Sequence, residues 1–121
     1  MFKRQDIPVD PNGNSISVQV ICGFAQHIDF DFDLFDSQGN NPQRLPGGSN
    51  IHSDPPPFVL NVVPSQLIGR FLLVTATVQS LGGDNLSVDA VFTQDGQEKG
   101  RIPVVGTFTD AKTVSLVARF V

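Results

Sequence analysis

The sequence predicts an all-β protein with about eight mainly antiparallel strands, arranged as a β-sandwich or a flattened barrel. Glutamate occurs once and lysine three times, so the residues that favour exposed helix surfaces are scarce. Several short segments alternate apolar and polar residues, which is the pattern of strands with one buried face. Eleven glycines and nine prolines separate these segments. With 121 residues and a hydrophobic fraction of 40%, we expect a single β-sandwich domain over residues 1–121.

The first two predicted strands carry the clearest alternation. In residues 15–23, Ile16, Val18 and Val20 share one face, and we expect Cys22 to continue it as an inert core residue. Residues 27–35 form the second predicted strand. One of its faces is wholly apolar: Ile28, Phe30, Phe32 and Leu34. The opposite face is polar: His27, Asp29, Asp31 and Asp33. Phenylalanine, with ten residues in the chain, is expected to dominate the core.

The later strands are predicted from shorter patterns. They lie at residues 43–45, 58–63, 70–78, 86–93, 101–108 and 113–121. Turn sequences rich in Gly, Asn and Asp separate several of them, at 37–41, 82–85 and 94–96. The segment 47–57, which ends in three prolines, is predicted to be the longest surface loop.

The two halves of the chain resemble each other, which predicts a tandem duplication. The aligned positions are Pro8 with Pro64, Gly13 with Gly69, Phe35 with Phe92, Gly39 with Gly96, and Arg44 with Arg101. Repeat one covers residues 7–62 and repeat two covers residues 63–121, with four strands in each. Because one four-stranded sheet leaves its apolar face uncovered, we expect the two halves to cover each other about a pseudo-two-fold axis.

The charge and the composition exclude several kinds of partner. The net charge is −4 and the basic residues are scattered, whereas a nucleic-acid-binding surface needs a basic stripe. No apolar run reaches the ~20 residues of a membrane-spanning helix. The first residues also lack the apolar stretch of a signal peptide. We therefore expect no nucleic-acid partner, no membrane span and a cytoplasmic location. The single cysteine excludes an intramolecular disulfide.

Carboxylates along the second predicted strand form a candidate metal site. Asp29, Asp31 and Asp33 lie on one face, about 6.6–6.8 Å apart along the strand, and repel one another. Calcium takes six to eight oxygen ligands, and Asp36 in the next turn would add one more. The alternative interpretation is a solvated strand whose charges discourage edge-to-edge aggregation. We favour this alternative, so no cofactor is expected and calcium is kept as a hypothesis.

A second candidate site is the predicted loop before the three prolines. Binding residues concentrate on such loops, and here the candidates are Ser49, Asn50, His52 and Asp54. The two histidines, His27 and His52, stand 25 residues apart, a spacing that does not by itself predict a zinc site. A hydrolytic triad can be assembled from the residue types present, but the G-x-S-x-G turn of one large hydrolase class is absent.

The function that these observations favour is a non-enzymatic binding or assembly module, with a protein partner or a second copy as its target. A subunit of a larger complex is one form of such a module. One alternative is a calcium-assisted module that binds a ligand such as carbohydrate. The absence of Trp and Tyr argues against carbohydrate, because those rings are common stacking platforms. The other alternative is a small hydrolase that uses His27 or His52 with an acidic partner.

Overall fold

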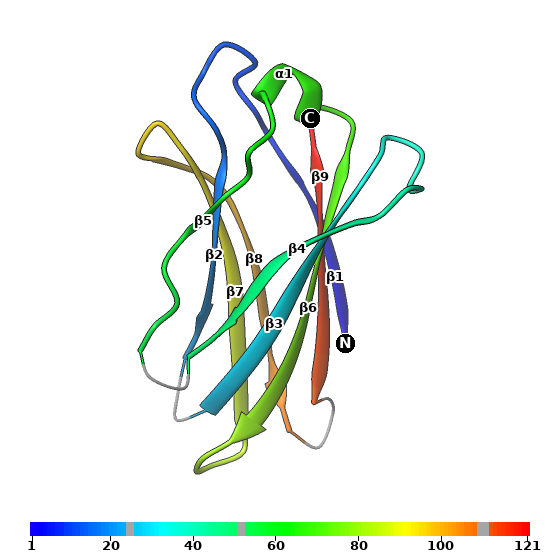
Figure 1. Cartoon of the computed structure of the whole chain (residues 1–121). Coiled ribbons are helices and arrows are strands. Elements are labelled where there is room, and N and C mark those ends of the chain that lie inside the picture. Colours follow the sequence, from blue (N-terminus) through cyan, green and yellow to red (C-terminus); the bar gives the residue numbers. More distant parts are fainter. Residues whose placement is uncertain (24–25, 51–52, 109–111) are drawn as a thin grey trace.

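The computed structural model describes residues 1–23, 26–50, 53–108 and 112–121, and it confirms the all-β sandwich (Figure 1). The described residues contain nine strands, one more than expected. They are β1 (Phe2–Ile7), β2 (Ser17–Cys22), β3 (Gln26–Phe35), β4 (Gln43–Ser49), β5 (Phe58–Val59), β6 (Phe71–Ser80), β7 (Asn85–Gln94), β8 (Gln97–Thr107) and β9 (Thr113–Phe120). One helical turn, α1 (Pro64–Leu67), lies between β5 and β6.

Two sheets enclose the core. Sheet A has the strand order β1-β9-β6-β3-β4, and sheet B has the order β5-β2-β7-β8. β1 and β9 run parallel, and the other pairings are antiparallel. The largest fully buried side chains include three aromatic rings, those of Phe32, Phe92 and Phe120. The rings of Phe92 and Phe120 meet edge to face across the sandwich, with their centroids 5.8 Å apart.

The predicted alternation along β3 is confirmed residue by residue. Its apolar side chains are buried: Ile28, Phe30, Phe32 and Leu34. β3 pairs with β6 over ten consecutive residues, from Gln26 opposite Ser80 to Phe35 opposite Phe71. This long register turns the carboxylate-bearing face of β3 away from sheet B and toward solvent.

The first strand was not predicted, because its own residues carry no burial pattern. From Phe2 to Asp6 every residue is exposed, and only Ile7 is buried. β1 is a strand because its backbone pairs with β9, a segment more than 100 residues away in the chain. An edge strand of this kind does not have to alternate apolar and polar residues.

The prediction of a long loop over 47–57 is wrong at its start, because β4 continues through Gly47 and Gly48 to Ser49. These glycines let the edge strand approach β3 closely: a Cβ at Gly47 would overlap the carbonyl oxygen of Phe30. A Cβ at Gly48 would lie 2.7 Å from the Phe30 ring, so the ring packs directly over the glycine.

The strand predicted at 58–63 is also shorter than expected. Only Phe58 and Val59 pair with β2, and the chain then turns into α1, where Pro64 occupies the first helical position. Within the described residues, no helix has the length and apolar character of a membrane span.

The two sides of the sandwich differ. On one side β1 and β8 are in contact, so the edges of the two sheets meet. On the other side lie β4 and β5, which make no comparable contact in the described parts of the chain. By these contacts, the sandwich is closed along one seam and open along the other in the described residues.

The strand orders of the two sheets correspond. Under the predicted duplication, the four strands β2 to β5 correspond in turn to the four strands β6 to β9. When each strand of sheet B is replaced by its counterpart, the order β5-β2-β7-β8 becomes β9-β6-β3-β4, which is the order found in sheet A. Arg44 on β4 and Arg101 on β8 occupy matching edge strands, and each pairs with an aspartate of the neighbouring strand, Asp33 or Asp89. A tandem duplication predicts this order, although the duplication itself stays a prediction.

Candidate functional site

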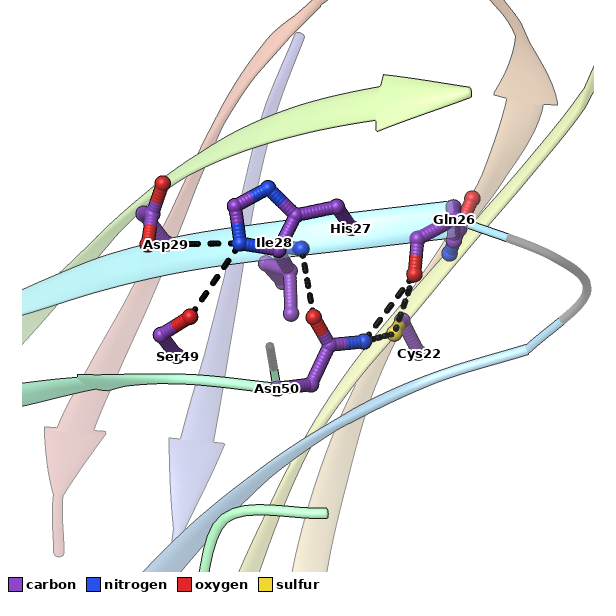
Figure 2. A network of polar contacts seen from close by, with 7 residues as sticks. All are labelled: Cys22, Gln26, His27, Ile28, Asp29, Ser49 and Asn50. Carbon is purple, nitrogen blue, oxygen red and sulfur yellow. Dashed lines mark hydrogen bonds and ion pairs between the residues drawn. The ribbon is translucent and has the colours of Figure 1, made fainter. Parts of the chain in front are cut away.

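Two of the four residues predicted as a binding loop lie against the start of β3. Figure 2 shows Ser49, the last residue of β4, and Asn50 facing His27, Ile28 and Cys22. Asp54 lies on the exposed segment before the prolines. The fourth predicted residue, His52, lies outside the described residues. The structure thus places Ser49 and Asn50 in a polar network at the end of β3.

The Asn50 side chain is the centre of this network (Figure 2). Its Oδ1 accepts a hydrogen bond from the backbone N–H of Ile28 at 2.9 Å. Its Nδ2 donates to the backbone oxygen of Gln26 at 3.0 Å and to the Sγ of Cys22 at 2.9 Å. The amide therefore forms hydrogen bonds with three groups of the same chain. These bonds hold the segment after β4 against the start of β3.

Cys22 and Gln26 form the inner part of the network. Burial raises the pKa of the Cys22 thiol, which keeps it in the unreactive thiol form. The Gln26 side chain is buried and its Nε2 donates to the backbone oxygen of Ser87 on β7, linking the two sheets. Its Oε1 has no hydrogen-bond partner within the described residues. Gln94, the other buried glutamine of the described residues, forms hydrogen bonds through both its Nε2 and its Oε1.

Ser49, His27 and Asp29 bring the residue types of a hydrolytic triad together, but not in its geometry. The Nε2 of His27 lies 3.2 Å from the Ser49 Oγ and 3.7 Å from the Asp29 Oδ1. In a working triad the serine and the carboxylate bind opposite nitrogens of the ring, so that the carboxylate orients the base. Here both groups share one nitrogen, as Figure 2 shows, and the carboxylate does not orient the ring toward the serine.

A cavity of about 240 Å³ adjoins this network. It is lined by Gln26, His27, Asn50, Gln79 and Leu81. Four of these residues carry an amide or an imidazole group, and the fifth is an exposed leucine. The amide of Asn50 is already hydrogen-bonded to three groups of the chain.

The carboxylates predicted as metal ligands on β3 lie on its outer face, as expected. The positive charge beside two of them is the guanidinium of Arg44. The Nε of Arg44 lies 2.8 Å from the Asp33 carboxylate, and its Nη1 lies 3.7 Å from that of Asp31. Both carboxylates raise the pKa of the Arg44 guanidinium. Asp29 lies apart from this pair and is close to His27. In the described residues, no three His, Cys, Asp or Glu side chains gather in a way that would hold a metal ion.

Asp36, the fourth predicted metal ligand, is occupied in the turn between β3 and β4. Its Oδ1 accepts hydrogen bonds from the backbone N–H groups of Gln38 and Asn40, at 2.9 and 2.8 Å. Its Oδ2 accepts one from the Asn41 side chain at 2.8 Å. These bonds lower the pKa of the Asp36 carboxyl. The residue is therefore a turn-forming group, and it does not converge with the other three carboxylates.

The structure also contains a hollow that the sequence did not predict, along the open side of the sandwich. We call it the seam groove, and it consists of two adjoining cavities that share Pro46 and Phe58. The larger, of about 310 Å³, is lined by Leu34, Gln43, Leu45, Pro46, Phe58, Leu60, Asn61 and Val62. The smaller, of about 120 Å³, is lined by Phe30, Phe32, Pro46, Gly47, Gly48, Pro55, Pro56, Pro57 and Phe58. The seam groove joins β4 of sheet A to the segment around β5 of sheet B.

The apolar character of the seam groove comes from the core itself. Leu34 and Leu60 are fully buried beneath it, while Leu45, Phe58 and Val62 are partly buried and pack against the core. No local signal in the sequence marks these residues as neighbours, because the groove forms only where the edges of two sheets stay apart. The sequence feature that lies beside the groove is the triple proline before Phe58, and that feature predicts a stiff connector but not a groove.

Comparison with known proteins finds no family model, no curated protein and no solved structure that matches this chain.

Proposed function

We propose that this protein is a non-enzymatic binding module that holds an extended, apolar segment of a partner protein in the seam groove. The observation that supports this function is the open seam, where apolar core side chains border a groove between two sheet edges. Burial of apolar surface is the main favourable term in protein association, so such a groove offers binding free energy.

The shape of the seam groove favours an extended segment over a globular ligand. Two adjoining cavities follow one another along the edge of β4. In an extended chain, side chains on one face recur about every 6.6–6.8 Å, so that two successive ones can enter neighbouring pockets. The larger cavity suits a branched or aromatic side chain and the smaller one suits a compact side chain.

The prolines around the groove indicate how the segment is recognised. Pro46 lies within the edge strand β4, and Pro55, Pro56 and Pro57 precede β5. Proline has no backbone N–H and cannot extend a ladder of hydrogen bonds to an added strand. Recognition therefore depends on apolar side chains, with fewer backbone hydrogen bonds than in the addition of a strand to a sheet edge.

The geometry at His27 supports the non-enzymatic part of the proposal. Ser49 and Asp29 contact the same ring nitrogen, an arrangement that does not relay a proton from a serine to an oriented base. The Cys22 thiol, with its raised pKa, is likewise a poor nucleophile.

A selection with displayed random peptides tests the proposal. Twelve-residue phage-displayed peptides are selected on the purified protein, and the enriched peptides are synthesised and titrated into ¹⁵N-labelled protein. We expect peptides with alternating apolar residues, and chemical-shift changes concentrated at Leu45, Phe58 and Val62. Asn61→Trp should weaken peptide binding by at least about tenfold, because the new ring covers the groove from an exposed position.

The matched control is Asn85→Trp, which places the same ring at another exposed asparagine, at the start of β7. This variant should bind the peptides as the unmodified protein does. Failure to enrich any peptide, enriched peptides whose shift changes map elsewhere, or equal binding by both Trp variants would overturn the proposal.

A further inference from the structure

The outer face of sheet A, which points away from sheet B, carries an apolar patch at one end of its middle strands and charges of opposite sign on the strands to either side of that patch. The alternation along β6 and β9 leaves Phe71, Leu73 and Val117 on this face, each half-buried by its neighbours in the sheet. The carboxylates of β3 lie to one side, and Arg4 and Arg119 lie to the other, on β1 and β9. Sheet B covers the opposite face, so no strand of the described residues packs on this one.

One row of residues across sheet A shows the arrangement directly. Arg4 is paired with Val117, Val117 with Leu73, and Leu73 with Asp33. Read across β1, β9, β6 and β3, the row is cation, apolar, apolar, anion, and it ends on β4 with Arg44, the ion-pair partner of Asp33. The guanidinium of Arg4 is held over this face, because it lies 5.4 Å from the centre of the Phe71 ring.

We infer that the outer face of sheet A binds a second copy of this chain in a symmetric dimer. The two-fold axis runs parallel to the strands and passes between β9 and β6. Rotation about that axis places Arg4 of each copy opposite Asp33 of the other, and Val117 opposite Leu73. Over the four strands from β1 to β3, the row has a cation at one end, an anion at the other and apolar residues between them, so it is complementary to itself in this orientation. Arg44 on β4 then lies beyond the edge of the partner's β1. This inference goes beyond the proposed function and uses a different surface.

The charges on the two sides remain unbalanced after pairing within the chain. On the acidic side, the three carboxylates Asp29, Asp31 and Asp33 have one guanidinium, that of Arg44, between them. Asp31 keeps 56% of its side chain exposed. On the basic side, Arg4 and Arg119 share the face with one carboxylate, that of Asp6. Packed sheets lie about 10 Å apart, a separation that arginine side chains can bridge.

Two charge-reversal variants and their mixture test the dimer. Sedimentation velocity over a range of concentrations should show a monomer–dimer equilibrium for the unmodified protein. Arg4→Glu and Asp31→Lys should each weaken dimerisation by at least about tenfold. Arg4→Glu places a carboxylate opposite Asp33, and Asp31→Lys places an ammonium one same-face step along β3 from the position opposite Arg4. Lys3→Glu is the matched control, since Lys3 lies beside Arg4 on β1 but pairs with the buried Leu116 and faces the other way.

An equimolar mixture of Arg4→Glu and Asp31→Lys should restore dimerisation. In the mixed dimer, the new carboxylate at position 4 lies opposite Asp33, one same-face step of about 6.6–6.8 Å along β3 from the new ammonium at position 31. The long lysine side chain can span this step, and the unchanged Arg4 faces the unchanged carboxylates. Thermal unfolding of each variant, followed by circular dichroism, checks that the monomers fold. A protein that stays monomeric at all concentrations, a dimer that tolerates both reversals, or a mixture of folded variants that stays monomeric would overturn the inference. None of these outcomes affects peptide binding in the seam groove.

Discussion

Asn50 and Ile28 exchange two hydrogen bonds, although only one of them joins two backbone groups. The backbone N–H of Asn50 donates to the carbonyl of Ile28 at 3.2 Å, and the N–H of Ile28 donates to the Oδ1 of the Asn50 side chain at 2.9 Å. The amide side chain thus stands in for the carbonyl of a strand residue. It extends the pairing of β3 with β4 by one residue beyond the end of β4.

Replacing Asn50 by alanine should destabilise the protein by about 1–3 kcal/mol, because the N–H of the buried Ile28 loses its acceptor. Chemical unfolding in urea, followed by circular dichroism, measures this change in the free energy of unfolding. Asn85→Ala is the control: it removes an exposed asparagine and should change stability by no more than about 0.5 kcal/mol. Equal effects of the two substitutions would contradict a structural role for the Asn50 side chain.

The buried face of β3 should be sensitive to truncation of its aromatic residues. Phe30→Ala and Phe32→Ala should each cost about 3–5 kcal/mol, as usual for emptying a buried aromatic site. Phe32 is 1% exposed and its ring packs 5.6 Å from that of Phe58, while Phe30 is 6% exposed and packs over Gly48. Phe2→Ala, at a position that is 64% exposed, is the control. Urea unfolding gives all three values, and losses below about 1 kcal/mol at both buried positions would mean that this face is not the core.

The carboxylates of β3 should not respond to calcium. Arg44 already lies between Asp31 and Asp33, so we expect calcium at millimolar concentration to leave the melting temperature unchanged. Asp31→Asn should alter stability by no more than about 0.5 kcal/mol, because the pair is exposed to solvent. Differential scanning fluorimetry with and without calcium measures both effects. A rise in melting temperature that calcium causes and that Asp31→Asn abolishes would instead support the calcium-binding alternative, since a ligand of the folded state must stabilise it.

The turn at Asp36 should make stability depend on pH in the acidic range. Hydrogen bonds from Asn40 and Asn41 lower the pKa of this carboxyl in the folded protein relative to the unfolded chain. The ionised carboxylate therefore stabilises the folded state above the unfolded pKa, and this contribution is lost as the pH falls through the lower, folded pKa. Asp36→Asn should reduce the melting temperature at neutral pH, and the difference from the unmodified protein should shrink on acidification. A difference that stays constant with pH would contradict this role.

The sequence by itself determined the class of the fold and the two faces of its most regular strand. Along β3 the alternation of Phe and Asp has a period of two, and a strand turns successive side chains to opposite faces. Burial of Phe30 and Phe32 and exposure of Asp29 and Asp31 follow from this local geometry, and the structure confirms both. The positions of the turns follow in the same way, because Gly39 and Gly96 adopt the positive φ angles that glycine favours.

The tertiary structure alone decided which distant residues meet. β1 has no pattern of its own and becomes a strand through its pairing with β9. The Asn50 amide acts on Ile28, and Arg44 reaches Asp33, because β4 folds back along β3 in one particular register. The row from Arg4 to Asp33 and the open seam beside Phe58 depend on the order of strands that lie far apart in the chain. Periodicity specifies the face on which a side chain lies, whereas strand order and register, which determine its neighbours, depend on packing energy summed over the whole sandwich.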